Sequence, residues 1–108
     1  MSLAAAMRSA KEVLASQMTE DELLSVIIQA AHARGWLAYH IRDSKRGVTQ
    51  GDPGFVDLVL AREGHVLFLE LKGEVGRVSD AQADWLGALP SAQVIRPKDL
   101  DVVLEWLR

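Results

Sequence analysis

Three charged side chains stand in apolar runs that otherwise resemble buried strands. Glu70 and Lys72 lie two residues apart at the end of the run 65–72, so a strand would place both on the same face. Asp57 stands within the preceding apolar run, 55–60. A buried charge is costly unless it is paired, hydrogen-bonded or bound to a metal. We therefore expect these side chains to share a partly desolvated polar pocket.

Two carboxylates followed by a lysine suit the hydrolysis of phosphodiesters. That reaction needs an activated water and stabilisation of negative charge on the phosphoryl oxygens, and one or two Mg²⁺ ions supply both. Mg²⁺ prefers hard oxygen ligands, which predicts Asp57, Glu70 and the backbone carbonyl of Leu71 as its ligands. Lys72 would orient the water or neutralise the developing charge. The simpler alternative is that Glu70 and Lys72 form an ion pair and Asp57 caps a turn.

The elements that must position these residues form an α/β pattern. The order is α-β-β-β-α-β-α, which predicts a mixed central sheet flanked by helices. Helices are expected between Thr19 and Gly35, over 80–89 and from Pro97 onward, and strands over 36–41, 55–61, 65–72 and 92–95. The short connection 62–64 predicts a hairpin between the second and third strands. Such a hairpin would bring Asp57 and Glu70 to the same end of the sheet.

Length and composition bound the fold and the cellular location. The 108 residues suffice for one domain, which we place at 19–108 after an alanine-rich segment, 1–18, that forms a helix or an arm. The chain has no cysteine, no apolar run near the ~20 residues of a membrane span, and no signal-peptide pattern. We expect a cytoplasmic protein without a membrane partner. A zinc site is not expected, because neither cysteine nor a clustered histidine pair is present.

Basic and polar residues in the two long loops are candidate contacts for nucleic acid. The net charge of −3 argues against non-specific coating of nucleic acid but permits a local patch. The predicted DNA-binding residues are Arg42, Ser44, Lys45, Arg46 and Arg77. Their phosphate contacts would make binding sensitive to salt. The alternative for each of them is an ordinary solvated surface residue.

His40, at the end of the first predicted strand, is a further candidate. An unperturbed histidine titrates near neutral pH and could take part in proton transfer. Strand alternation places its side chain on the face opposite to those of Tyr39 and Ile41. The competing interpretation is therefore a half-buried structural histidine.

From Glu20 to Leu107 the chain resembles the virus-type replication-repair nuclease (VRR-NUC) branch of the PD-(D/E)XK nuclease superfamily. The matching residues are Glu20, Leu23, Gly35-Trp36, Gly54-Phe55-Val56-Asp57-Leu58, Glu70-Leu71-Lys72, Ser79, Gln82, Trp85 and Leu89. The pair Arg96-Pro97 and the elements around it also resemble small phage and prophage members. One position departs from the family pattern, since Val56 stands where a proline usually precedes the aspartate.

The resemblance implies Mg²⁺- or Mn²⁺-dependent cleavage of DNA, often branched or four-way junction DNA, frequently by a homodimer. It also implies that Glu20 is a metal ligand and Gln82 a catalytic-site residue. Acidic residues favour helix N-termini through the helix dipole alone, so Glu20 has an alternative explanation, as does Glu22 in a capping box with Thr19. Gln82 can equally be a polar surface residue, and Ser79 is expected to cap its helix.

Three function classes follow from these observations. The first is a metal-dependent DNA endonuclease of phage-type replication, recombination or repair. The second is a catalytically silent nucleic-acid-binding module on the same fold. The third is an interaction or assembly protein that uses the alanine-rich segment. The nuclease is preferred because Asp57, Glu70 and Lys72 close two adjacent apolar strands.

Overall fold

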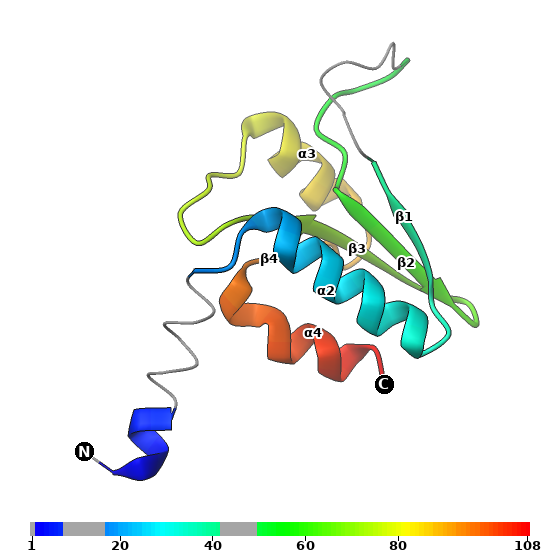
Figure 1. Ribbon diagram of the computed structural model, residues 1–108. Helices are drawn as coiled ribbons and strands as arrows, with labels where there is room; N and C mark the ends of the chain where they lie inside the picture. Colours follow the sequence, from blue (N-terminus) through cyan, green and yellow to red (C-terminus); the bar gives the residue numbers. More distant parts are fainter. Residues whose placement is uncertain (1, 8–16, 42–49) are drawn as a thin grey trace.

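The computed structural model describes residues 2–7, 17–41 and 50–108 (Figure 1). Its centre is a four-stranded sheet in the order β1-β2-β3-β4. The strands are β1 (Leu37–His40), β2 (Leu58–Arg62), β3 (His65–Leu71) and β4 (Gln93–Ile95). The first three strands are antiparallel neighbours and β4 runs parallel to β3. The predicted mixed sheet is therefore confirmed, and the β2–β3 hairpin is as expected.

Helices cover both faces of this sheet. They are α2 (Glu20–Ala33), α3 (Asp80–Ala88) and α4 (Leu100–Trp106), with a 3₁₀ turn, η1 (Pro97–Asp99), directly before α4. In Figure 1, α2 and α4 lie side by side in front of the sheet and α3 lies behind it. The predicted element order is confirmed, with Pro97 opening a 3₁₀ turn rather than the helix itself.

The main core lies between the sheet and the α2–α4 layer. Alternate residues of the strands point into it, so Leu58 and Leu60 of β2 pair with Leu69 and Leu67 of β3, and the buried Leu71 lies on the same face of β3. The remaining buried members of this cluster are Leu23, Ile27, Ala31, Trp36, Ile95, Val103 and Leu107. The intervening residues, among them Phe68 and Glu70, point toward α3. Because successive side chains of a strand alternate between its faces, burial of Leu69 and Leu71 in the main core directs Glu70 toward α3.

The start of α2 is set by local sequence. Thr19 accepts a hydrogen bond from the backbone of Glu22, and the Glu22 side chain accepts one from the backbone of Thr19. This is the predicted capping box. At the other end, Gly35 adopts φ +81°, and the buried Trp36 leads into β1.

Two strand predictions need correction. The second strand begins at Leu58 rather than at residue 55, so Asp57 lies just before the strand instead of inside it. The reason is that Gly54 has φ +92° and the chain before it lies against α3. The run 65–72 resembles a buried strand in sequence, yet Val66 is 43% exposed in the structure. Only the last three residues of β3, 69–71, are buried, with side chains on both faces of the strand.

Residues 3–7 form a short helix in which Leu3 and Met7 are exposed. Residues 8–16 lie outside the described part, so the separation of 1–18 from the domain stays a prediction. Among the described residues, no helix is long and apolar enough to cross a membrane.

Candidate active site

Asp57 is held in place by backbone groups of both neighbouring strands. Its carboxylate oxygen Oδ2 accepts a hydrogen bond from the backbone N–H of Leu71 at 2.9 Å, and its carbonyl accepts one from Ile41 at 3.2 Å. Leu58 pairs with Leu69, so the next position toward the sheet end sets Asp57 opposite Glu70. The hairpin therefore brings these two acids together, as the sequence predicts.

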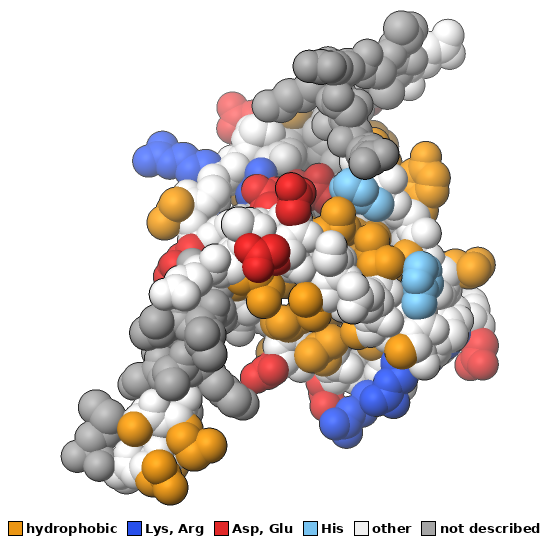
Figure 2. Space-filling model, viewed as in Figure 1, with side chains coloured by type: hydrophobic (Ala, Val, Ile, Leu, Met, Phe, Trp, Pro, Cys, Tyr) orange, Lys and Arg blue, Asp and Glu red, His pale blue; other side chains and the backbone are white. Residues whose placement is uncertain are grey.

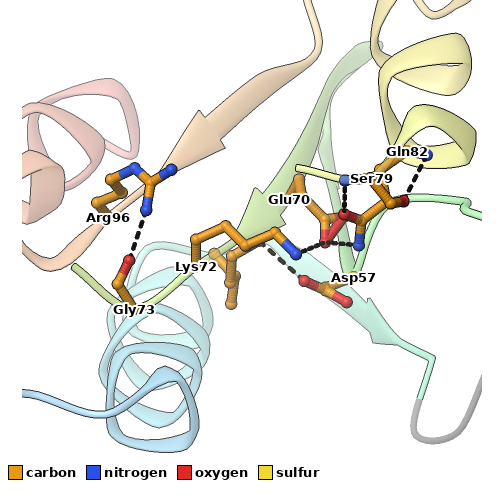
Figure 3. A network of polar contacts seen from close by, with 8 residues as sticks. Asp57, Glu70, Lys72, Gly73, Ser79, Gln82 and Arg96 are labelled. Carbon is orange, nitrogen blue, oxygen red and sulfur yellow. Dashed lines mark hydrogen bonds and ion pairs between the residues drawn. The ribbon is translucent and has the colours of Figure 1, made fainter. Parts of the chain in front are cut away.

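Glu70 is the only buried charged residue in the described part of the chain, with 1% of its surface exposed. Its Oε1 atom accepts a hydrogen bond from the side-chain amide of Gln82 at 3.0 Å and lies 4.0 Å from the Nζ atom of Lys72. Its Oε2 atom is also buried, and no described residue hydrogen-bonds to it. Figure 3 shows Asp57, Lys72 and Gln82 around this carboxylate.

The environment of Glu70 favours its neutral form. The pKa of Glu70 is raised from 4.5 to about 8, and burial is the largest cause. Hydrogen bonding with the adjacent Asp57 and charge repulsion from it contribute to the same rise. The positive charge of Lys72 acts in the opposite direction and lowers this pKa. A proton shared with Asp57 would satisfy the unpartnered oxygen, and so would a cation.

β3 ends at Leu71, one residue earlier than the predicted strand end, and Lys72 follows it directly. The side chain of Lys72 is 13% exposed and lies on the same face as Glu70, which confirms the predicted partly desolvated pocket. The N–H and C=O groups of one strand residue point to the same edge of the strand. Since the N–H of Leu71 binds Asp57, its carbonyl is directed to that side too.

Gln82 connects α3 to the pocket through both ends of its amide. Its nitrogen donates to Glu70, and its oxygen accepts from the backbone N–H of Ser79 at 2.9 Å. The hydroxyl of Ser79 accepts in turn from the backbone of Gln82 at 3.1 Å. Ser79 therefore caps α3 as predicted. Gln82 belongs to the capping box as well as to the pocket, a double role that the Ser-x-x-Gln spacing could have indicated.

Glu20 is the first residue of α2 and is exposed. Its negative charge raises the pKa of Glu70, so the start of α2 lies close enough to the pocket for their charges to interact. Figure 2 shows acidic side chains gathered where α2 begins. The side chain of Glu22 instead binds the backbone of Thr19 in the capping box, so the two glutamates have different roles.

Of the other predicted site residues, the structure describes only Arg77 and His40. Arg42, Ser44, Lys45 and Arg46 lie outside the described residues, so their contact with DNA stays a prediction. Arg77 is exposed on the loop between β3 and α3. His40 is half-buried at the end of β1, paired in register with Leu58.

One positioning contact was missed by the sequence interpretation. The guanidinium of Arg96, at the end of β4, donates to the carbonyl of Gly73 at 2.7 Å and to that of Glu74 at 3.2 Å (Figure 3). It thereby fastens the loop that directly follows Lys72. Nothing in the local pattern of an isolated arginine points to a contact with a loop more than twenty residues earlier.

The pocket offers oxygen donors for a divalent cation, but among the described residues it lacks the three-carboxylate ligand set that the sequence predicts. The described residues contain no group of three or more His, Asp or Glu side chains that could hold a metal ion, so Glu20, Asp57 and Glu70 do not form such a group. Asp57 and Glu70 nevertheless face each other, and a buried carboxylate oxygen lacks a partner. Hard oxygen donors of this kind match the preference of Mg²⁺ and Mn²⁺.

A model of the VRR-NUC domain matches residues 5–96 of the chain. The chain belongs to the VRR-NUC family. No curated protein and no solved structure matches it. A VRR-NUC domain implies a nuclease of the PD-(D/E)XK type, with DNA as its substrate, and the α/β sheet agrees with that fold. Nucleases of this type generally use divalent metals.

Proposed function

We propose that this VRR-NUC protein is a Mg²⁺- or Mn²⁺-dependent DNA endonuclease that prefers branched or junction DNA. The observation that carries the metal dependence is Glu70, a carboxylate 1% exposed with one oxygen unpartnered among the described residues and Asp57 beside it. Such a site is costly when both acids are ionised and nothing compensates their charge. A divalent cation would compensate it.

Asp57, Glu70 and the carbonyl of Leu71 are the groups that would hold the ion. When bound, the ion supplies positive charge for the phosphoryl oxygens and lowers the pKa of the attacking water. Asp57 is already oriented by the N–H of Leu71, and Glu70 by the amide of Gln82. Glu20, at the start of α2, adds negative charge near the pocket and would bind through water rather than directly.

Lys72 is the proposed catalytic cation. Its ammonium lies 4.0 Å from Glu70 and its side chain is largely screened from solvent, which strengthens its interactions with a phosphate. It would donate hydrogen bonds to the attacking water and offset negative charge that develops on the phosphate. This role agrees with its place on the same strand face as Glu70.

The preference for branched DNA, a phage-type role in replication, recombination or repair, and a homodimer rest on the family resemblance. The residues that would contact the phosphates flanking the cut are Arg77, Arg42, Ser44, Lys45 and Arg46. A dimer would set two active sites at a fixed separation, which suits the cutting of two strands at a junction. Sedimentation of the protein with and without a four-way junction measures that assembly, and a monomer in both samples would contradict it.

The proposed activity is tested by cleavage of labelled single-stranded, duplex, flap and four-way junction DNA with EDTA, Mg²⁺ or Mn²⁺. We expect metal-dependent cutting, strongest on the branched substrates, that is lost in Glu70→Gln and Lys72→Ala. A matched control is Glu63→Gln, which removes an exposed carboxylate at the β2–β3 turn. Binding without cutting in every metal would identify a nucleic-acid-binding module instead.

A further inference from the structure

Trp85 of α3 holds the chain segment that leads to Asp57. Its indole N–H donates to the carbonyl of Pro53 at 3.0 Å and to that of Asp52 at 3.3 Å. Its ring meets the ring of Phe55 edge-on, with centroids 4.9 Å apart at 90°. Phe55 in turn meets Phe68 of β3 at 6.5 Å. One tryptophan thus binds this segment through polar and aromatic contacts.

Gly54 brings the same segment directly onto the first turn of α3. A Cβ atom added at Gly54 would lie 2.5 Å from the carbonyl carbon of Ala81 and 2.7 Å from the backbone nitrogen of Gln82. Those neighbours are backbone atoms, which cannot rotate away. The contact between the segment and the helix therefore leaves no space for a side chain.

The two acids of the pocket are consequently joined through one helix. Asp57 follows the segment 52–55 after the fully buried Val56. Glu70 is bound to the same helix through Gln82, which lies less than one turn from Trp85. Asp57 is therefore tied to α3 through this segment, in addition to the hydrogen bond that it accepts from the backbone of Leu71.

We propose that Trp85 is a positioning residue that sets the spacing of Asp57 and Glu70 and thereby the affinity of the pocket for divalent metal. This inference rests on the proposed function, since it assigns the two acids to one metal. Trp85 itself touches no reacting group. Residues that orient metal ligands in this way typically change metal affinity by 10–100-fold when they are altered.

The test compares Trp85→Phe with Trp106→Phe. The first substitution keeps an aromatic ring against Phe55 but removes the N–H donor. The second removes an indole N–H from Trp106 at the end of α4, where 39% of the residue is exposed. Mn²⁺ binding is measured without DNA, by calorimetry and by the rise of the melting temperature with Mn²⁺ concentration. Cleavage is then measured over the same range of Mn²⁺.

We expect the Mn²⁺ concentration for half-maximal binding to rise roughly tenfold or more in Trp85→Phe and to stay unchanged in Trp106→Phe. Cleavage by Trp85→Phe should recover at high Mn²⁺. A merely structural role would lower the metal-free melting temperature and leave the Mn²⁺ midpoint of the folded protein unchanged, which would overturn the inference. If Trp85→Phe does not fold, Phe55→Leu is tested in its place, because it removes the ring partner of Trp85 and keeps the indole donor. A raised Mn²⁺ midpoint in Phe55→Leu would support the inference, and an unchanged midpoint would overturn it.

Failure of this inference and failure of the proposed function give different results. Wild-type protein that binds Mn²⁺ but cuts no DNA contradicts the nuclease assignment alone. Trp85→Phe that binds Mn²⁺ as tightly as the wild type contradicts the positioning role alone. Wild-type protein that binds no divalent metal contradicts both.

Discussion

The side-chain amide of Gln82 donates to Oε1 of Glu70 at 3.0 Å while its oxygen accepts from the backbone of Ser79. One side chain therefore closes the N-terminal cap of α3 and hydrogen-bonds one of the two oxygens of the buried Glu70 carboxylate. Because both contacts use the same amide, the start of the helix and the orientation of Glu70 are fixed together.

Gln82→Ala should impair both the helix cap and the pocket. Loss of the cap contact should cost about 1 kcal/mol in the free energy of unfolding, and loss of the donor leaves Oε1 of Glu70 unsatisfied as well. Cleavage should fall strongly. The matched variant Ser79→Ala removes the hydroxyl of the cap but keeps the contact with Glu70, so it should lose stability and keep more activity. Equal activity in the two variants would contradict the role of Gln82 in the pocket.

The stability of the metal-free protein should fall as the pH rises. The pKa of Glu70 is about 8 in the folded protein and 4.5 when unperturbed, so the folded state binds more protons between these values. The free energy of unfolding that this proton contributes is fully present below the unperturbed pKa of 4.5. It is lost progressively as the pH rises through the folded pKa of about 8. Each pKa unit corresponds to about 1.4 kcal/mol, which predicts a loss of a few kcal/mol.

This dependence is measured by denaturant unfolding in EDTA between about pH 5 and pH 9. Glu70→Gln stays neutral throughout and should flatten the profile. Mn²⁺ should stabilise the wild type most at the higher pH, because a cation favours the ionised carboxylate. An identical pH profile for wild type and Glu70→Gln would show that Glu70 is not the group responsible.

Arg62 should contribute to stability and not to catalysis. Its guanidinium lies 4.5 Å from the centre of the Trp36 ring and donates to the carbonyls of Arg34, Leu107 and Arg108. It thus joins the ends of α2 and α4, where helix carbonyls lack partners. Arg62→Ala should cost about 2–3 kcal/mol in the free energy of unfolding.

Arg62→Lys is the matched control for that prediction, because it keeps the charge but lacks the planar set of donors. We expect an intermediate loss of stability from it. Arg62 lies about 16 Å along β2 from Asp57, so cleavage well below the melting temperature should equal that of the wild type in both variants. A selective loss of cleavage in a fully folded Arg62→Ala would contradict this assignment.

Gly54→Ala should be much more damaging than Gly64→Ala. Both glycines have positive φ, +92° and +81°, so each substitution carries a similar backbone cost of about 1 kcal/mol. Only at Gly54 would the new methyl group collide with backbone atoms of α3, whereas no atom lies within 4 Å of the position at Gly64. Thermal unfolding and Mn²⁺ titration of the two variants check the difference. Similar behaviour of both would show that the segment can move off α3.

Several parts of the fold follow from local sequence because their causes are local. The capping boxes at Thr19 and Ser79, the glycine at the end of α2 and the hairpin at 62–64 depend on residues a few positions apart. Alternation of apolar residues in β3 also places Glu70 and Lys72 on one face. The start of β2 could not be predicted in this way, since the contact of residues 52–55 with α3 determines it.

The amino-acid sequence is enough to predict the order of the elements, the approach of Asp57 to Glu70 across a hairpin, and the charged pocket at the end of β3. These depend on periodicity and on register, which neighbouring residues specify. Three contacts depend instead on how the elements pack. Arg96 binds the loop after Lys72, Arg62 joins two helix ends, and Trp85 holds the segment before Asp57. They cannot be predicted from local sequence because a side-chain donor binds whichever carbonyl the packed helices and strands bring within about 3 Å, and no sequence pattern specifies that distance.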